Sequence, residues 1–304
     1  RKHIQNDKDF DKLVADIKKA KKPARKIKTK ENGSMVVCLS DWQLGKRDGD
    51  GTEGIIKRTT QMIPDVIDRV KELRKAGNPI NKLYVFGLGD LVEGCGDHYA
   101  MQNFSVEIDQ RRQEMVARRL IIKALMAWAP HFDKIVVAAV PGNHGENRKN
   151  GKAHTTFGDN IDVAVFDQAQ EALSMNKAFD HISFVIPDNE LWLTLDIDGV
   201  ILGLAHGHQF RTGGRYSHQK AVAWLSGQAF GKTDIGDVDI LLSGHFHHLF
   251  VINEGQRTLM QAPSVDGGSE WFENITGKNS FAGVLTFTIK NKKNKLPWDN
   301  LQVL

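Results

Sequence analysis

Three histidines occur within four positions in the stretch DILLSGHFHH, residues 239–248. The apolar run Ile240 to Leu242 has the length and branching of a buried strand, and it ends just before Gly244. Histidine is the commonest metal ligand among side chains, and a preceding glycine permits a tight turn. This spacing predicts that His245 and His247 project toward one point and hold metal. Taken alone, the stretch fits a polar loop rich in histidine equally well.

Four earlier segments repeat the arrangement of a short apolar run followed by a metal-ligating or hydrogen-bonding residue. The runs are VVCLS, LYVFGLG, IVVAAVPG and VILGLA. In open α/β sheets ligands bind outside the carboxyl ends of the strands, so five such ends should deliver their side chains to one crevice. The candidate set is, in chain order, Asp41, Gln43, Asp90, Asn143, His144, His206, His245 and His247.

Alternating strands and helices are expected between these residues. Apolar runs predict strands over residues 35–39, 83–87, 135–140 and 240–242, and helical spacing predicts helices over about 55–76, 106–128, 161–173 and 221–230. Three consecutive strands, HISFVI, ELWLTLDI and VILGLA, and a hairpin in LFVINEGQRTLMQA are expected as well. The alternation predicts an α/β fold.

The composition is that of an ordinary globular protein of one large domain or two small ones, with 304 residues, 40% hydrophobic and 26% charged. No apolar stretch approaches the roughly 20 residues of a membrane helix, so no membrane association is expected. Cys38 and Cys95 show no paired spacing and fit a reducing compartment. We therefore expect a cytoplasmic protein.

Positive charge is concentrated at the start of the chain. The net charge is +4, yet residues 1–35 contain 12 basic and 5 acidic residues, which leaves a net −3 for the rest. We expect a basic N-terminal arm over 1–34 with a short amphipathic helix, a main domain over 35–290, and a lysine-rich tail over 291–304. The arm either follows a phosphate backbone through counterion release or is a solvated leader.

In order, the candidate residues resemble the motifs of the calcineurin-like metallophosphoesterases: D-x-H, G-D-x-x-[DE], G-N-H-[DE], a lone histidine after a strand, and G-H-x-H. The similarity covers residues 35 to 265. It implies a four-layer α/β/β/α sandwich with two mixed sheets and a two-metal centre, in which Asp90 bridges the ions and His144 stabilises the transferring phosphoryl group or protonates the leaving oxygen. By the same resemblance, the remaining ligands divide into Asp41, Gln43 and His247 at one ion, and Asn143, His206 and His245 at the other.

Two positions depart from the family pattern. Gln43 stands where the family usually has histidine, and it can ligate only through a neutral amide oxygen. The resemblance therefore implies two divalent ions with Mn²⁺ favoured, while Mg²⁺, Zn²⁺ and Fe²⁺ stay open. In the third motif the family has an acidic residue directly after the histidine, whereas here Gly145 intervenes and Glu146 follows. Glu146 would therefore support the ligands only approximately as the family's acidic residue does.

The substrate is expected to be a phosphodiester. Protein phosphatases of this family follow the bridging aspartate with Asp-Arg-Gly, whereas here the residues after Asp90 are Leu-Val-Glu-Gly. Loop residues that could line a rim for a polyanion, or else be ordinary loop charges, are Lys46, Arg47, Arg148, Lys149, Arg211 and Arg215. His208 and His248 either contact ligands or substrate or have no special role; we place His208 with Arg148, Arg211 and Arg215 as substrate-binding.

Together with the basic arm, these features suggest a metal-dependent nuclease acting on DNA, similar to the nuclease subunits of double-strand-break repair complexes. That resemblance implies nucleic acid as a partner, with a second copy of the chain or an accessory ATPase beside it. A small-molecule phosphodiesterase or phosphatase is one alternative. The other is a scaffold, because some family members keep the fold and serve as binding platforms.

Overall fold

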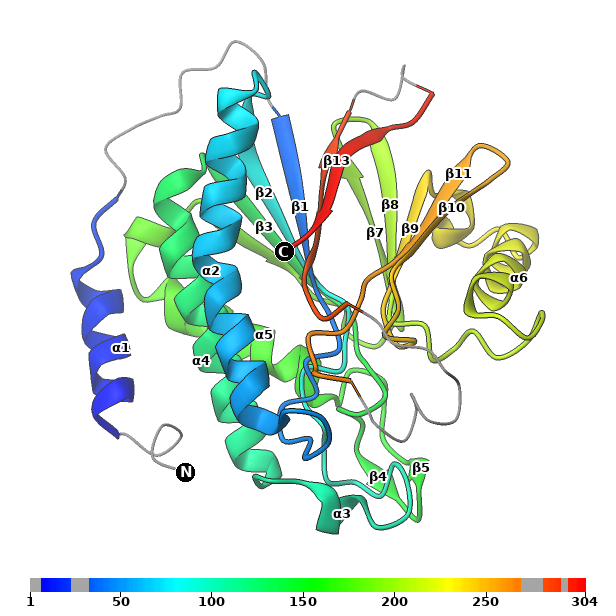
Figure 1. Ribbon diagram of the computed structural model, residues 1–304, viewed down its shortest axis with the longest axis horizontal. Coiled ribbons are helices and arrows are strands. Elements are labelled where there is room, and N and C mark those ends of the chain that lie inside the picture. Colours follow the sequence, from blue (N-terminus) through cyan, green and yellow to red (C-terminus); the bar gives the residue numbers. More distant parts are fainter. Residues whose placement is uncertain (1–6, 23–32, 269–280, 291–294) are drawn as a thin grey trace.

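Two mixed β-sheets pack face to face, with helices on the outer face of each (Figure 1). The computed structural model describes residues 7–22, 33–268, 281–290 and 295–304. The strand order is β13-β12-β1-β2-β3-β6 in one sheet and β10-β11-β9-β8-β7 in the other. These layers confirm the predicted four-layer α/β/β/α sandwich.

The first sheet is parallel at its centre and antiparallel at one edge. β1 to β2, β2 to β3 and β3 to β6 are parallel pairs, whereas β12 pairs antiparallel with β1 and the edge strand β13 pairs antiparallel with β12. Its strands are β1 (Gly33–Leu39), β2 (Ile80–Gly87), β3 (Lys134–Ala139), β6 (Ile182–Val185), β12 (Leu285–Ile289) and β13 (Trp298–Val303).

In the second sheet, β8, β9 and β11 run parallel, and an antiparallel strand flanks them on each side. Its strands are β7 (Trp192–Ile197), β8 (Val200–Ala205), β9 (Ile240–Ser243), β10 (Phe250–Glu254) and β11 (Arg257–Gln261). A separate small hairpin consists of β4 (Arg148–Lys149) and β5 (Lys152–Ala153).

Helices cover both outer faces. Helices α2, α4 and α5 lie on the first sheet, and α6 lies on the second (Figure 1). The helices are α1 (Asp7–Lys19), α2 (Gly51–Lys75), α3 (Gln102–Ser105), α4 (Gln110–Trp128), α5 (Ile161–Ser174) and α6 (Ser217–Phe230), with 3₁₀ turns at Ala129–His131, Lys177–Phe179 and Asp234–Asp237. The four expected helices are therefore confirmed, with ends shifted by a few residues.

The central strands are apolar over most of their length because both of their faces are covered. In β1, Val36 packs between the two sheets while Val37 packs under the helices, and both are fully buried. Phe86 and Leu242 meet in the same inter-sheet layer from opposite sheets. This double burial produces the uninterrupted apolar runs that made the strands visible in the sequence.

The N-terminal helix packs on the domain. Leu13 and Ile17 are buried in the helical layer, and the Asn176 side-chain amide donates a hydrogen bond to the Ile17 carbonyl oxygen at 2.6 Å. The amphipathic helix is confirmed, but placing it in an arm outside the domain was wrong, since its apolar face is part of the core. The remaining basic residues of the expected arm, in 1–6 and 23–32, lie outside the described residues.

Replacing Ile17 with alanine should lower the free energy of unfolding by about 2 kcal/mol, because it removes a buried aliphatic side chain that is 4% exposed. Urea denaturation followed by circular dichroism measures the change. Asp16→Ala, at an exposed neighbouring position of the same helix, is the matched control. Equal midpoints for Ile17→Ala and the unmodified protein would show that α1 adds nothing to domain stability.

The end of the chain is also part of the fold. Residues 298–303, expected to lie in a tail, form the edge strand β13, and Trp298 and Leu301 pack between the sheets. The Trp298 indole N–H donates to Thr258 Oγ1 at 3.0 Å. The overall polar composition of this segment gave no sign that Trp298 and Leu301 would be packed between the two sheets. Residues 291–294 of the expected tail are outside the described part.

Within the described residues, no helix is both long enough and apolar enough to cross a membrane.

Candidate metal centre

The candidate ligands come from the carboxyl ends of parallel strands in both sheets. Asp41 and Asp90 follow β1 and β2, Asn143 comes shortly after β3, and His206 and His245 follow β8 and β9. Two facing sheets each contribute part of the set, and their carboxyl ends meet at one cleft.

Five of the seven candidate ligands have left-handed backbone conformations. The φ angles are 50° at Asp41, 46° at Gln43, 54° at Asp90, 71° at His245 and 60° at His247. Such angles cost a non-glycine residue about 1 kcal/mol or more, and they cluster at functional sites where the surroundings hold them. Here neighbouring loops supply the restraint: the N–H of Asp41 donates to the Gly89 carbonyl at 3.0 Å, and that of Gln43 to the Asp90 carbonyl at 2.9 Å.

Glycines in the motifs let the ligand loops approach one another closely. A Cβ on Gly244 would overlap the hydroxyl of Ser40 and the carboxylate of Asp41, and a Cβ on Gly142 would overlap Asp90. Each glycine therefore allows the loop of one strand to contact the ligand of another.

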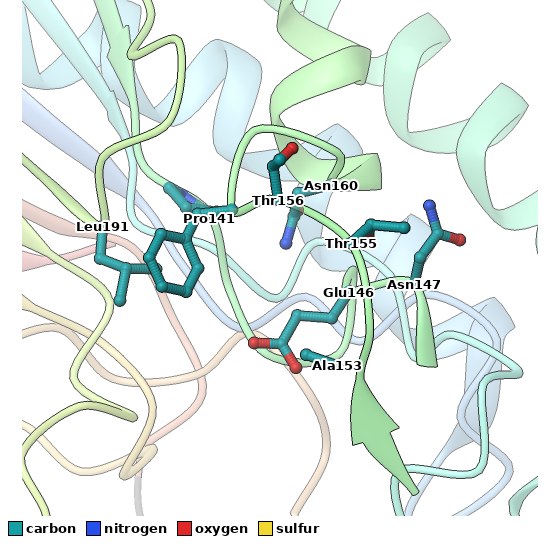
Figure 2. Close-up of a pocket in the computed structure, with 9 residues that line it drawn as sticks. Pro141, Glu146, Asn147, Ala153, Thr155, Thr156, Asn160 and Leu191 are labelled. Atoms are coloured by element: carbon teal, nitrogen blue, oxygen red, sulfur yellow. The ribbon is translucent and has the colours of Figure 1, made fainter. Parts of the chain in front are cut away.

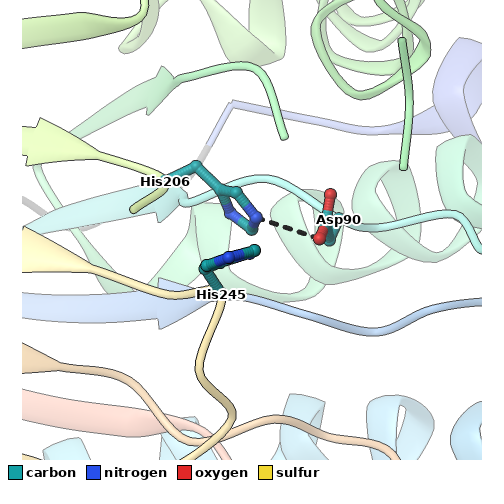
Figure 3. Close-up of side chains that lie close together, drawn as sticks. All are labelled: Asp90, His206 and His245. Atoms are coloured by element: carbon teal, nitrogen blue, oxygen red, sulfur yellow. Dashed lines mark ion pairs between the residues drawn. The ribbon is translucent and has the colours of Figure 1, made fainter. Parts of the chain in front are cut away.

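One half of the centre surrounds the Asp90 carboxylate (Figure 3). His206 Nε2 lies 2.9 Å from Asp90 Oδ2 and 3.1 Å from Asn143 Oδ1. His206 Nδ1 lies 2.6 Å from the Leu88 carbonyl oxygen, which fixes the ring so that Nε2 faces the carboxylate. One ligand atom from each of Asp90, His206 and His245 lies within 4.8 Å of the other two. This group could hold a metal ion.

The other half surrounds Asp41. Asp41 Oδ1 lies 3.3 Å from His247 Nε2, and the carboxylate also accepts the His245 N–H at 3.0 Å. Gln43 lines the same cleft, and its Nε2 lies 3.4 Å from His144 Nε2. The structure thus brings together all eight residues of the predicted set.

The charges of the centre fit divalent cations. Burial raises the pKa of Asp90, but His206 and neighbouring histidines outweigh it, so the pKa lies well below its ordinary value. Burial lowers the pKa of His206, yet Asp90 raises it to about 9 overall. Burial lowers the pKa of His245 to about 3, which keeps that ring neutral and able to ligate. A buried ionised carboxylate attracts cations, and the carboxylate, imidazole and amide groups around it can all ligate a divalent metal ion.

His144 is held beside the ligands with one ring nitrogen directed into the cleft. Its Nδ1 lies 2.9 Å from the Glu93 carbonyl oxygen and 3.5 Å from the Glu93 carboxylate. Donation from Nδ1 leaves Nε2 on the side of Gln43. The His98 ring packs against His144 with centroids 4.3 Å apart, and the Tyr99 hydroxyl donates to Glu93 at 2.8 Å. The predicted acid therefore has a carboxylate partner, Glu93, to which the sequence analysis gave no role.

Asp162 joins two ligand loops from the start of α5, and the sequence analysis missed it. Its Oδ2 accepts the N–H of Asp90 at 2.8 Å and of Gly142 at 3.2 Å, and its Oδ1 accepts the N–H of Leu91 at 2.8 Å. The carboxylate is 1% exposed. No spacing signal marks such a residue, because it accepts hydrogen bonds from backbone groups 20 to 72 residues away in the sequence.

Asp162→Ala should lower the free energy of unfolding by about 3 kcal/mol, since it leaves three backbone N–H groups without their acceptor. Chemical denaturation measures the loss. Asp167→Ala on an exposed position of the same helix serves as the control and should change little. A loss below about 0.5 kcal/mol for Asp162→Ala would argue against this role.

Asp266 is a second residue that the sequence analysis missed. It forms an ion pair with Lys46, and its Oδ2 lies 3.8 Å from His247 Nδ1. A carboxylate behind a ligating histidine orients the ring and raises its basicity, as is usual around metal sites. Asp266 follows β11 by five positions in the turn SVDGG, and nothing in that stretch marks it as close to residue 247.

Comparisons with known proteins give a likeness of structure only. No family model and no curated protein matches the chain. Similar solved structures include Vps29 of Entamoeba histolytica complexed with Zn²⁺, at 16% identity over 85% of this chain and 87% of that one, with a TM-score of 0.38. A novel archaeal phosphodiesterase is similar at 12% identity over 89% of this chain and 99% of that one, with a TM-score of 0.37. A predicted phosphoesterase of Streptococcus pneumoniae is similar at 13% identity over 84% of this chain and 83% of that one, with a TM-score of 0.35.

A cleft of about 1620 Å³ opens over the centre and is lined by Gln43, Asp90, Asn143, His144, His245 and His247. Of the four residues predicted to bind substrate, Arg215 is among the described residues that line it, and Arg148, Arg211 and His208 are not. The Arg148 guanidinium is instead paired with Glu146 at 2.6 Å and donates to the Gly151 carbonyl at 2.8 Å.

His208 lies behind the ligands. Its ring centroid is 5.5 Å from that of His206 and 6.3 Å from that of His245. Glu146, the late acidic residue, lies 3.9 Å from His208 Nε2 and also lines a separate hollow of about 10 Å³ (Figure 2). That hollow has room for one water molecule at most. Glu146 thus pairs with Arg148 and lies near His208 beside the centre.

Proposed function

We propose that this protein is a metal-dependent phosphodiester hydrolase that acts on nucleic acid. The observation that carries the proposal is the convergence of the predicted ligands from two sheets around Asp90, with His144 beside them. Two divalent ions bound there would clamp a phosphoryl group and activate a water molecule as the nucleophile. Asp41, Gln43 and His247 would hold one ion, Asn143, His206 and His245 the other, and Asp90 would bridge them.

The chain's own residues supply the proton for the leaving group. His144 Nδ1 donates to the Glu93 carbonyl, so the ring presents Nε2 to the cleft. When doubly protonated, this ring can donate the Nε2 proton to the departing oxygen, and the Glu93 carboxylate 3.5 Å away stabilises the imidazolium. The His144 backbone N–H donates to Asp90 Oδ1 at 2.8 Å, which ties the position of this acid to the bridging carboxylate.

Two features favour a diester in a polymer over a terminal phosphate. Gly94 ends the Asp-Leu-Val-Glu-Gly segment, which lacks the arginine that grips a monoester in the family's phosphatases. The cleft is open and large, and Arg47, Arg215 and Lys220 line it. Cations along an open cleft suit a polyanion whose backbone extends beyond the reacting phosphate.

Gln43 favours one alternative, a scaffold that has lost catalysis. A neutral amide oxygen binds divalent ions more weakly than imidazole binds Zn²⁺, so the first site is the weaker one. Metal analysis separates the two functions: two Mn²⁺ per chain with hydrolysis support the enzyme, whereas one ion or none without hydrolysis supports the scaffold.

The direct test is a parallel assay with Mn²⁺ on bis(p-nitrophenyl) phosphate, p-nitrophenyl phosphate, and labelled single- and double-stranded DNA. We expect hydrolysis of the diester and of DNA to exceed that of the monoester by at least tenfold. Turnover of the small diester without cleavage of any nucleic acid would assign a small-molecule phosphodiesterase. Preference for the monoester would contradict the proposal.

A further inference from the structure

One side of the cleft is lined with aromatic rings. They come from the N-terminal end of α6, from the segment between β9 and β10, and from the first residue of β10. We call Tyr216, His218, Phe246 and Phe250 the aromatic wall. The rings of Tyr216 and His218 are stacked, with centroids 5.7 Å apart and planes 7° from parallel. His218 meets the edge of Phe250 at 6.3 Å.

The aromatic wall reaches the metal centre. Phe246 stands between the candidate ligands His245 and His247 in sequence, and its ring centroid is 4.8 Å from that of His245. At the other end, Tyr216 is 49% exposed at the mouth of the cleft. An extended molecule lying along the wall would therefore pass from Tyr216 to the predicted ions.

Cations accompany the rings. Lys220 Nζ lies 5.8 Å from the Phe246 ring centroid, and Arg215, which directly precedes Tyr216, is exposed and lines the cleft. Gln219 orders this segment, since its side-chain oxygen accepts the backbone N–H of Arg215 at 3.1 Å and of Tyr216 at 3.2 Å. The ring and the cation at the mouth are thus held on a fixed backbone, which reduces the entropy lost on binding.

Flat rings next to cations match unpaired nucleotides. Proteins that bind single strands stack successive bases on aromatic side chains while basic groups follow the phosphates, and every base offers a π-face for this. In a duplex those faces are covered by neighbouring base pairs. Two more exposed rings, Tyr99 at 42% and Phe281 at 82%, also line the cleft.

We propose that the aromatic wall binds the unpaired bases of single-stranded nucleic acid, with Tyr216 as the outermost stacking platform and Arg215 and Lys220 on the phosphates. The inference rests on the proposed function and deepens it, since it names the strand form that reaches the metal centre. A duplex end would have to separate before one of its strands could lie along the wall.

Fluorescence anisotropy with a labelled 15-nucleotide oligothymidylate tests the proposal. The His144→Ala background with Mn²⁺ slows hydrolysis during the measurement. Tyr216→Ala should weaken binding at least about tenfold and Tyr216→Phe less than about threefold, because phenylalanine keeps the stacking face. Phe230→Ala is the matched control: this ring is 90% exposed at the far end of α6 and is not among the described cleft residues, so its affinity should equal that of the background.

An abasic oligonucleotide of the same length separates base stacking from other causes. If Tyr216 stacks on bases, Tyr216→Ala should not weaken binding of the abasic strand, and the background protein should bind that strand at least about tenfold more weakly than oligothymidylate. Equal effects of Tyr216→Ala on both strands, or duplex DNA binding as tightly as the single strand, would overturn the proposal. Hydrolysis of bis(p-nitrophenyl) phosphate by the unmodified protein reports on the proposed function separately, because that diester has no nucleobase.

Discussion

Replacing Asp90 with alanine should lower hydrolysis of bis(p-nitrophenyl) phosphate by at least about a thousandfold and reduce bound Mn²⁺ from two ions per chain toward none. The Asp90 carboxylate lies 2.9 Å from His206 Nε2 and accepts the backbone N–H of His144. In the proposed centre, it would bridge both ions. Metal activation supplies several kcal/mol of transition-state stabilisation, and each 1.36 kcal/mol is tenfold in rate. Steady-state kinetics and metal analysis of the same sample measure the two effects.

Asp90→Asn refines this prediction because it removes the charge while keeping an oxygen for the His144 N–H. It should lose activity almost as completely as Asp90→Ala. Asp68→Asn, an exposed aspartate on α2, controls for the loss of one negative charge. Full metal content together with full activity in Asp90→Asn would exclude Asp90 as the bridge.

Replacing His144 with alanine should lower kcat on DNA by about a hundredfold to ten thousandfold, the usual range for a positioned general acid. Metal content should stay at the unmodified level, because in the proposed centre His144 is not a ligand. The loss should be smaller for bis(p-nitrophenyl) phosphate, since nitrophenolate leaves readily without a proton whereas a sugar alkoxide does not. Single-turnover cleavage of DNA and steady-state assays of the small diester provide the comparison.

His154→Ala is the matched control for this prediction, because that histidine is exposed and contacts only the Asn147 carbonyl among the contacts found in the described residues. Glu93→Gln should reproduce part of the His144 defect, since it removes the carboxylate 3.5 Å from the ring. If His144→Ala slows both substrates by the same factor, the residue stabilises charge on the phosphoryl group and protonates no leaving oxygen.

Within this chain, local sequence predicted the strands and the side chains at their ends. Both faces of β1 and β2 are covered, so their residues form continuous apolar runs, and the run stops where the chain leaves the sheet. Asp41 and Asp90 stand just beyond those strands, where the chain leaves the sheet and a polar side chain can face the cleft. The same reasoning found His206 and His245 after β8 and β9.

Local sequence was misleading where a side chain's role depends on a distant partner. Arg148 has the charge of a rim residue but is paired with Glu146, away from the cleft lining. Residues 298–303 have a polar composition, yet they pair with β12 as an edge strand because Trp298 and Leu301 pack between the sheets. The amino-acid composition of a segment gives its average polarity, but it does not show which side chains form ion pairs or pack in the core.

The amino-acid sequence by itself determined the central strands, because strands buried on both faces leave apolar runs. Through the resemblance of its ordered motifs, it also determined the four-layer class and the identity and order of the candidate ligands. Only the tertiary structure decided that Asp162 joins the Asp90 and Gly142 loops, and that the start of α6 lies against Phe246 and Phe250 to form the aromatic wall. These features rest on contacts between segments tens to hundreds of residues apart, whose distances are fixed only when the sheets pack face to face.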